Sequence, residues 1–123
     1  MAKKILVIDD EHELVKAVEI RLRASGYEVE VAYDGASGIE KVKETSPDLV
    51  LLDIIMPKMN GYEVCEKLIA DSETKGIPII IFTASQKKGL EAKCNDLGVT
   101  DFIVKPFETE NLLNIVNEIL NKD

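Results

Sequence analysis

Residues 4–11 read KILVIDDE, a short apolar run that ends in a group of acidic residues. Four more apolar runs follow along the chain, and together the runs are Ile5–Ile8, Val29–Val31, Leu49–Leu52, Ile77–Phe82 and Phe102–Val104. Runs made almost wholly of Ile, Leu and Val are typical of strands buried on both faces of a parallel sheet. The second run alternates with glutamates, which predicts a strand at the edge of that sheet.

The stretches between the runs have helical periodicity. In the first stretch, Leu14, Val18 and Leu22 recur every four residues, and Gly26 follows as a residue that ends helices. The later stretches are marked by Ile39 and Val42, by Val64 and Leu68, by Leu90, Cys94 and Leu97, and by Leu112, Leu113, Val116 and Leu120. Thr109 is expected as the N-cap of the last helix. This alternation predicts one α/β domain, a (βα)₅ unit with helices on both faces of a parallel sheet.

The composition excludes several classes of protein. The chain has 123 residues, of which 46% are hydrophobic and 31% are charged, as in a folded domain. Its 15 basic and 23 acidic residues give a net charge of −8, so we expect no nucleic-acid or membrane partner. No apolar run is long enough for a membrane span or a signal peptide, which predicts a cytoplasmic protein. Cys65 and Cys94 are expected to be free thiols.

Polar side chains come at the ends of four of the five predicted strands. Asp9 and Asp10 follow the first strand, Asp53 follows the third, Thr83 ends the fourth, and Lys105 follows the fifth. Because the carboxyl ends of parallel strands meet at one edge, three carboxylates and a lysine should converge there. A divalent cation would offset the remaining negative charge, and oxygen ligands favour Mg²⁺ or Mn²⁺ over zinc. This pattern predicts phosphoryl chemistry.

The first turn after a strand argues against nucleotide-binding folds. Residues 9–13 read DDEHE and lack the glycines with which dinucleotide-binding and P-loop turns bring backbone N–H groups to phosphates. The acidic turn would also repel a phosphate, including that of a flavin mononucleotide, unless a metal ion intervened. His12, the only histidine, is interpreted as an exposed residue at the start of the first helix.

Four segments together resemble the receiver domain of two-component response regulators. They are KILVIDDE at residues 4–11, LLDIIMPKMNG at residues 51–61, Thr83-Ala84, and FIVKPF at residues 102–107. They occur in the order and at the spacing of that family, and the resemblance covers the whole chain. It implies a single receiver domain over residues 1–123, with a flavodoxin-like, doubly wound fold and the strand order 2-1-3-4-5.

The resemblance also implies a role for each acidic residue at the sheet edge. Asp53 corresponds to the aspartate that accepts the phosphoryl group. Asp9, Asp10, Asp53 and the backbone carbonyl of Ile55 correspond to the ligands of Mg²⁺ or Mn²⁺. In relatives, a polar side chain at the position of Ile55 can help place a hydrolytic water, so the lifetime of the phosphoryl group stays open here.

Three further positions of the family match residues near the acceptor. Thr83 and Lys105 correspond to residues that contact the bound phosphoryl group, and the bond between Lys105 and Pro106 corresponds to one that is often cis. Thr83 and Phe102 correspond to the residues of the family's conformational switch. The family often has Tyr where this chain has Phe102, which leaves the behaviour of the switch open.

Two expectations concern the surroundings of this edge. Ile20 lies about 200° around the first helix from Val18 and should face outward, either as an ordinary exposed residue or as part of a docking surface. The residues assigned to that docking surface are Ala17, Ile20, Met56 and Pro57. Asn60 is expected to cap the third helix, and Gly61 is expected to supply backbone freedom.

The sequence therefore predicts a stand-alone phosphoacceptor. It would take a phosphoryl group from a sensor histidine kinase or phosphotransfer protein onto Asp53 in a Mg²⁺-dependent reaction. It would then change a protein-binding surface formed by the fourth helix, fifth strand and fifth helix, for an unknown protein target. It is not expected to be an enzyme, beyond catalysing its own phosphorylation and dephosphorylation.

Two alternatives remain open. One is a Mg²⁺-dependent phosphatase of the haloacid-dehalogenase type, against which stands Ile54-Ile55 in place of that family's Asp-x-Asp pattern. The other is a receiver domain separated from a DNA-binding output domain.

Overall fold

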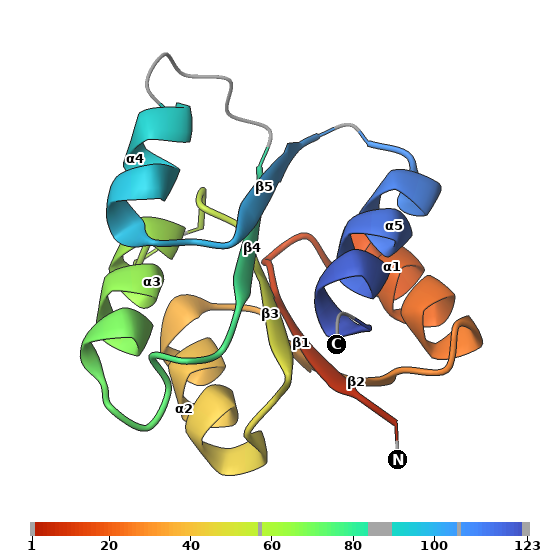
Figure 1. Cartoon of the computed structure of the whole chain (residues 1–123), viewed down its shortest axis with the longest axis horizontal. Coiled ribbons are helices and arrows are strands. Elements are labelled where there is room, and N and C mark those ends of the chain that lie inside the picture. The colour runs from red at the N-terminus through yellow and green to blue at the C-terminus, as the bar shows by residue number, and fades with distance from the viewer. Residues whose placement is uncertain (1, 57, 84–89, 106, 122–123) are drawn as a thin grey trace.

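The computed structural model describes residues 2–56, 58–83, 90–105 and 107–121. Within these residues, five strands alternate with five helices along the chain (Figure 1). The strands are β1 Lys4–Ile8, β2 Glu28–Ala32, β3 Leu49–Leu52, β4 Ile79–Thr83 and β5 Asp101–Val104. The helices are α1 His12–Ala24, α2 Gly35–Thr45, α3 Gly61–Ala70, α4 Leu90–Leu97 and α5 Thr109–Leu120.

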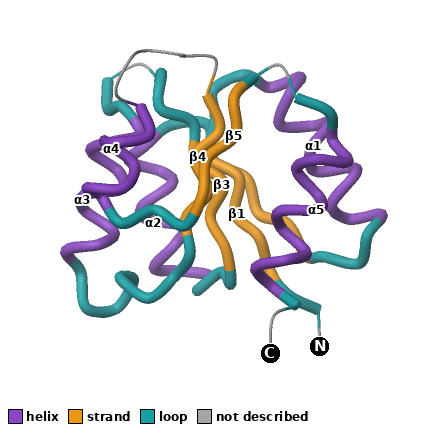
Figure 2. The backbone as a smooth tube through the Cα atoms, turned by 45° about the horizontal axis from the view of Figure 1, so that its top comes forward, coloured by secondary structure: helices purple, strands orange, loops and turns teal. Residues whose placement is uncertain are grey.

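The strands form one parallel sheet in the order β2-β1-β3-β4-β5. Helices α1 and α5 cover one face of the sheet, and α2, α3 and α4 cover the other (Figure 2). The predicted doubly wound fold and its strand order are therefore confirmed. Ile8 pairs with Ala32 on one side and with Leu52 on the other, so β1, β2 and β3 end level with one another.

Burial is greatest at the centre of the sheet. All four residues of β3 and residues 5–8 of β1 are fully buried, as expected for strands that helices cover on both faces. At one edge, β2 has the exposed Glu28 and two half-buried positions, which confirms the predicted edge strand. At the other edge, β5 is exposed at Asp101 and half-buried over its remaining residues.

Strands β1, β2 and β5 extend the predicted runs by one residue at one or both ends, and two further differences have a local cause. Strand β4 begins at Ile79 rather than Ile77, because the N–H of Ile77 donates to the carbonyl of Thr74 in the preceding turn. Pro78 then has no N–H to give to a neighbouring strand. Helix α5 has Glu108 as its N-cap, and Thr109 is its first helical residue, so the predicted cap is wrong by one position.

None of the helices in the described part of the chain has the length and apolar character that a bilayer span requires. Cys65 in α3 and Cys94 in α4 are both free, as predicted, and both are buried. Burial raises the pKa of Cys65 to about 11 and also raises the pKa of Cys94. Both thiols are therefore protonated at neutral pH and contribute to the apolar core.

Candidate functional site

The carboxyl edge of the sheet gathers the charged residues. Asp9 directly follows β1, Asp53 follows β3, Thr83 ends β4, and Lys105 follows β5. Backbone hydrogen bonds continue past the strand ends: Asp53 N–H donates to the Ile8 carbonyl at 2.9 Å, and Lys105 N–H to the Thr83 carbonyl at 2.8 Å. The structure thus brings together, at the ends of the strands, the residues that the sequence placed at this edge.

Asp9, Asp10 and Asp53 form an acidic cluster. Asp9 is fully buried, Asp53 is 2% exposed, and Asp10 is half-buried. One carboxylate oxygen from each lies within 4.8 Å of the other two, and a pocket of about 230 Å³ opens beside Asp10, Asp53 and Ile55. Like charges this close are unfavourable without a cation. Because all three donors are hard oxygens, the cluster fits Mg²⁺ or Mn²⁺.

Lys105 is the cation that the chain itself supplies to this cluster. Its Nζ lies 2.8 Å from Asp9 Oδ2, 3.2 Å from Glu11 Oε1 and 3.8 Å from Asp53 Oδ2, and it lies over the ring of Phe82. Burial alone would lower the pKa of Lys105, but its hydrogen bond to Asp9 and the charge of Asp53 outweigh burial and raise that pKa. The ammonium is therefore charged at neutral pH and offsets part of the negative charge.

The surroundings of Asp53 disfavour the ionised form of its carboxyl group. Burial, followed by the charge of Asp9, raises the pKa of Asp53 to about 7, although the Lys105 ammonium acts in the opposite direction. A carboxylate whose ionised form is disfavoured in this way gains much from a bound cation, which would restore its charge. Once ionised, such a carboxylate is able to act as a nucleophile.

The segment after Asp53 turns tightly against the start of α3. Gly61 N–H donates to the Ile54 carbonyl at 2.8 Å, and Asn60 caps the helix by accepting from the N–H of Glu63 at 3.0 Å. A Cβ at Gly61 would lie 2.2 Å from the backbone oxygen of Asp53. The cap at Asn60 is confirmed. The predicted reason for Gly61 is wrong, because its φ is not left-handed and crowding excludes a side chain.

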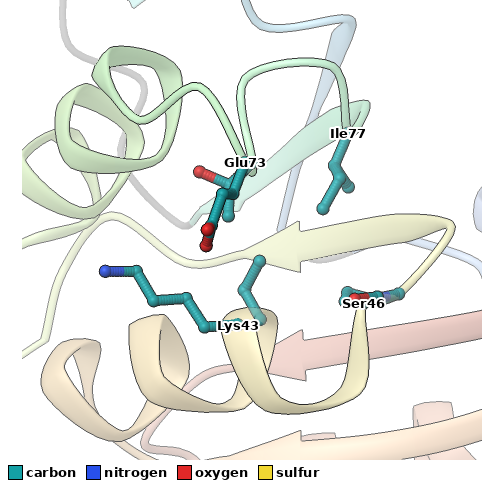
Figure 3. Close-up of a pocket in the computed structure, with 7 residues that line it drawn as sticks. Lys43, Ser46, Glu73 and Ile77 are labelled. Carbon is teal, nitrogen blue, oxygen red and sulfur yellow. The ribbon is translucent and has the colours of Figure 1, made fainter.

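A second and larger pocket lies at the opposite edge of the sheet (Figure 3). It has a volume of about 440 Å³ and lies between the end of α2, with Lys43 and Ser46, and the segment before β4, with Glu73 and Ile77. Lys43 Nζ is 3.3 Å from Asp71 Oδ2, so the basic residue that lines the pocket has a partner. Its described lining includes no cluster of like charges comparable to that at the carboxyl edge.

This geometry can be compared with known proteins. Residues 5–117 match the family model of the response regulator receiver domain. The chain belongs to this family. The response regulator ArlR of Staphylococcus saprophyticus is 38% identical over 119 residues, which are 97% of this receiver chain and 53% of ArlR. The DNA-binding dual master transcriptional regulator RpaA of Synechocystis is 35% identical, over 97% of this chain and 49% of RpaA. The chain thus spans about half the length of these two relatives.

Two solved receiver structures share the fold over the whole of their solved chains. The chemotaxis protein CheY4 of Vibrio cholerae has a TM-score of 0.91 and 31% identity, covering 98% of this chain and 100% of that chain. The receiver domain of the sensor histidine kinase PA1611 of Pseudomonas aeruginosa, solved with a magnesium ion in its active-site cleft, has a TM-score of 0.89 and 26% identity. That match covers 99% of this chain and 100% of the other. Membership of the family supports a phosphoacceptor role in two-component signalling.

The two residues assigned to the receiver's switch lie on adjacent strands. Thr83 is fully buried at the end of β4, and Phe102 of β5 is half-buried against the apolar cluster on the α2–α3–α4 face. Their part in a switch stays a prediction. Ile55 lines the smaller pocket and is 59% exposed.

The residues assigned to a docking surface do not all face outward. On α1, Ala17 is exposed and Ile20 is 60% exposed, as the helical spacing predicts. Met56 is only 8% exposed, because its side chain packs into the core cluster beside α3, so it is not available to a partner. Pro57 lies outside the described residues, and so does Pro106, which forms the bond that the resemblance describes as often cis.

Two contacts near the site are not predicted by the sequence. The Glu11 carboxylate forms an ion pair with the Lys105 ammonium. The only feature of the sequence that points to this contact is that Glu11 is acidic and directly follows Asp9 and Asp10. His12 is exposed at the start of α1, as predicted, but its ring also stacks on Tyr33 with the centroids 3.8 Å apart and the planes 4° from parallel. Nothing in the spacing of residues 12 and 33 indicates that stack.

Proposed function

We propose that this receiver domain accepts a phosphoryl group on Asp53 from a sensor histidine kinase or phosphotransfer protein. The observation that carries the proposal is the cluster of Asp9, Asp10 and Asp53, in which Asp9 and Asp53 lie beside the Lys105 ammonium and Asp10 and Asp53 line an open pocket. Membership of the receiver family supports the same role. The haloacid-dehalogenase alternative gains no support from the family match.

The chemistry follows from the positions of these groups. One carboxylate oxygen of Asp53 forms the new O–P bond while the bond from phosphorus to the donor's nitrogen breaks, and the leaving imidazole takes up a proton. Lys105, 3.8 Å from Asp53, is close enough to contact an oxygen of the transferred group. The Thr83 hydroxyl is the second group that we assign to the phosphoryl oxygens.

Asp9, Asp10, Asp53 and the backbone carbonyl of Ile55 would hold a Mg²⁺ ion. When bound, Mg²⁺ neutralises negative charge on the phosphoryl oxygens. The magnesium ion in the active-site cleft of the PA1611 receiver supports this choice of metal.

Two surfaces of the receiver would meet other proteins. The exposed Ala17 and Ile20 of α1 form a small apolar area that suits a helical phosphodonor. The face of α4, β5 and α5 would carry the signal to a downstream protein, with Thr83 and Phe102 linking it to Asp53. Met56 takes no part in docking in this proposal, because it is buried.

A second possibility concerns the length of the native protein. CheY4 is matched over the whole of its solved chain, whereas ArlR and RpaA are about twice as long as the matched region. The name of RpaA includes DNA binding, so an output domain of that kind is the specific alternative. The length of the native open reading frame distinguishes the two forms.

Intact-mass spectrometry after incubation with acetyl phosphate and Mg²⁺ tests the assignment of Asp53. The wild-type protein should gain one phosphoryl group, about 80 Da. Asp53→Asn should gain none, because the nucleophilic carboxylate is gone, while Asp96→Asn, at an exposed aspartate of α4, should be labelled like the wild type. Stoichiometric labelling of Asp53→Asn at the wild-type rate would show that another residue is the acceptor.

A further inference from the structure

Glu11 contacts the active-site lysine from outside the acidic cluster. Its Oε1 lies 3.2 Å from Lys105 Nζ, whereas Asp53 Oδ2 lies 3.8 Å from the same atom. The Glu11 side chain is 59% exposed, in contrast to the buried side chains of Asp9 and Asp53. The ammonium is thus shared between the carboxylate of the acceptor and a carboxylate that belongs to neither the acceptor nor the set of proposed metal ligands.

The backbone of Glu11 is held on both sides, so its side chain starts from a fixed point. Its N–H donates to Asp9 Oδ1 at 3.0 Å, and its carbonyl accepts from the N–H of Val15 at 3.0 Å in the first turn of α1. Glu11 is the N-cap residue of α1, with extended φ and ψ of −84° and 93°. From this anchored backbone position, the carboxylate reaches Lys105 Nζ.

The contacts of Lys105 favour the β1 side of the site. Asp9 and Glu11 are its two nearest carboxylates, and both belong to the loop between β1 and α1. Asp9 is fully buried and accepts at 2.8 Å, so this contact is the stronger one. Glu11 adds a second acceptor on the same side. The ammonium has three N–H donors, so one stays available to a phosphoryl group on Asp53, but both carboxylates attract the ammonium toward the β1 side.

We propose that Glu11 is a positioning residue that holds the Lys105 ammonium on the β1 side of the site and thereby slows phosphoryl transfer to Asp53. The inference rests on the proposed function and adds to it a residue that limits the resting reactivity. The negative charges of Glu11 and of the incoming phosphoryl oxygens attract the same ammonium. Removal of the Glu11 charge therefore leaves Lys105 more available to the transferred group, and transfer becomes faster.

The test compares Glu11→Gln with Glu13→Gln. Glu13 lies exposed in the first turn of α1, two residues away, and its replacement removes the same charge, whereas the ion pairs of Lys105 are with Asp9, Glu11 and Asp53. The rate of labelling by acetyl phosphate at saturating Mg²⁺ is followed by intact mass. We expect Glu11→Gln to react about two to five times faster than Glu13→Gln, the factor that an exposed ion pair supports.

A second background shows whether Glu11 acts through Lys105. In Lys105→Met the ammonium is absent, so Glu11→Gln and Glu13→Gln should react at the same rate as each other. A merely structural role of Glu11 would instead leave the difference between the two variants in place. Melting temperatures of all variants establish that each one is folded at the assay temperature.

The outcomes separate the two proposals. If the wild type is labelled but Glu11→Gln is labelled at the same rate as Glu13→Gln or more slowly, the role of Glu11 is overturned. The proposed function then stays intact. Persistence of the Glu11→Gln effect without Lys105 also overturns the role of Glu11. A wild-type protein that takes up no phosphoryl group overturns the proposed function and the role of Glu11 together.

Discussion

The two edges of the sheet each have a pocket, and the acidic cluster lies at the smaller one. The pocket at the carboxyl edge has about 230 Å³ beside Asp10, Asp53 and Lys105, whereas the pocket at the amino edge has about 440 Å³ (Figure 3). Parallel strands deliver their last residues to the carboxyl edge, so side chains far apart in the sequence meet there. Buried charges that repel one another indicate a functional site better than volume does.

A carboxylate at each edge shows this contrast. Burial and the charge of Asp9 raise the pKa of Asp53 to about 7. At the amino edge, the backbone hydrogen bond from Glu73 and then the side-chain hydrogen bond from Lys43 lower the pKa of Asp71. The charge of Asp71 is therefore satisfied by its own surroundings, whereas the charge of Asp53 requires a cation.

The largest difference between the edges should appear in the pH dependence of stability without metal. Between about pH 4 and pH 7, folded Asp53 keeps a proton that the unfolded chain has lost. The folded state then binds more protons, so the free energy of unfolding should fall as pH rises through this window, by up to a few kcal/mol. Asp53→Asn should lose this slope, and Asp71→Asn should keep it. Urea titrations in EDTA at a series of pH values measure the free energy of unfolding. If it has the same pH dependence in the wild type and in Asp53→Asn, the raised pKa does not belong to Asp53.

The second-largest difference between the two edges of the sheet should appear in the response to Mg²⁺. Mg²⁺ at about 100 times its dissociation constant should stabilise the wild type by about 2.7 kcal/mol. Asp10→Asn removes one repelling charge and one ligand, so its melting temperature should rise without Mg²⁺ and its response to Mg²⁺ should weaken. Glu73→Gln removes the same charge at the amino edge and should leave the response unchanged. Thermal melts with and without Mg²⁺ measure both melting temperatures. A lower melting temperature of Asp10→Asn without Mg²⁺, together with a full Mg²⁺ response, would refute the prediction.

The close approach of α3 to the acceptor predicts a third difference. Gly61→Ala places a Cβ against the backbone of Asp53 and Ile54, so it should destabilise the protein by about 1–3 kcal/mol and slow labelling of Asp53. Gly76→Ala is the matched control, because a Cβ at Gly76 meets no atom within 4 Å. Urea denaturation compares the two variants. Equal stabilities would mean that the loop accommodates the methyl group and that crowding is not the reason for Gly61.

The smallest effect is expected at the amino edge. Lys43→Gln breaks the ion pair with Asp71, in which the Lys43 side chain is 51% exposed, so stability should change by less than about 1 kcal/mol. Labelling of Asp53 by acetyl phosphate should stay at the wild-type rate. A several-fold change in that rate would show that the two edges are linked and would undo the contrast between them.

Much of this protein follows from short-range patterns in the sequence. Alternating buried strands and amphipathic helices predict the doubly wound sheet, because each pattern reports which face of an element must avoid water. Asp9, Asp53 and Lys105 could be placed at one edge because each stands at the end of an apolar run, and parallel strands all end on the same side. The cap at Asn60 follows in the same way from a local hydrogen bond.

What only the tertiary structure decided depends on contacts between distant parts of the chain. Glu11 and Lys105 are separated by 94 positions, and no periodicity reports the direction of two side chains across that distance. The burial of Met56 and the exclusion of a Cβ at Gly61 both depend on how closely α3 packs against the loop after β3. The raised pKa of Asp53 depends on its burial and on the charge of Asp9 beside it. Sequence alone determined that Asp9, Asp53 and Lys105 meet at the carboxyl edge. Packing added Glu11 to them and determined how strongly the groups interact, because electrostatic and steric energies vary steeply over a few ångströms.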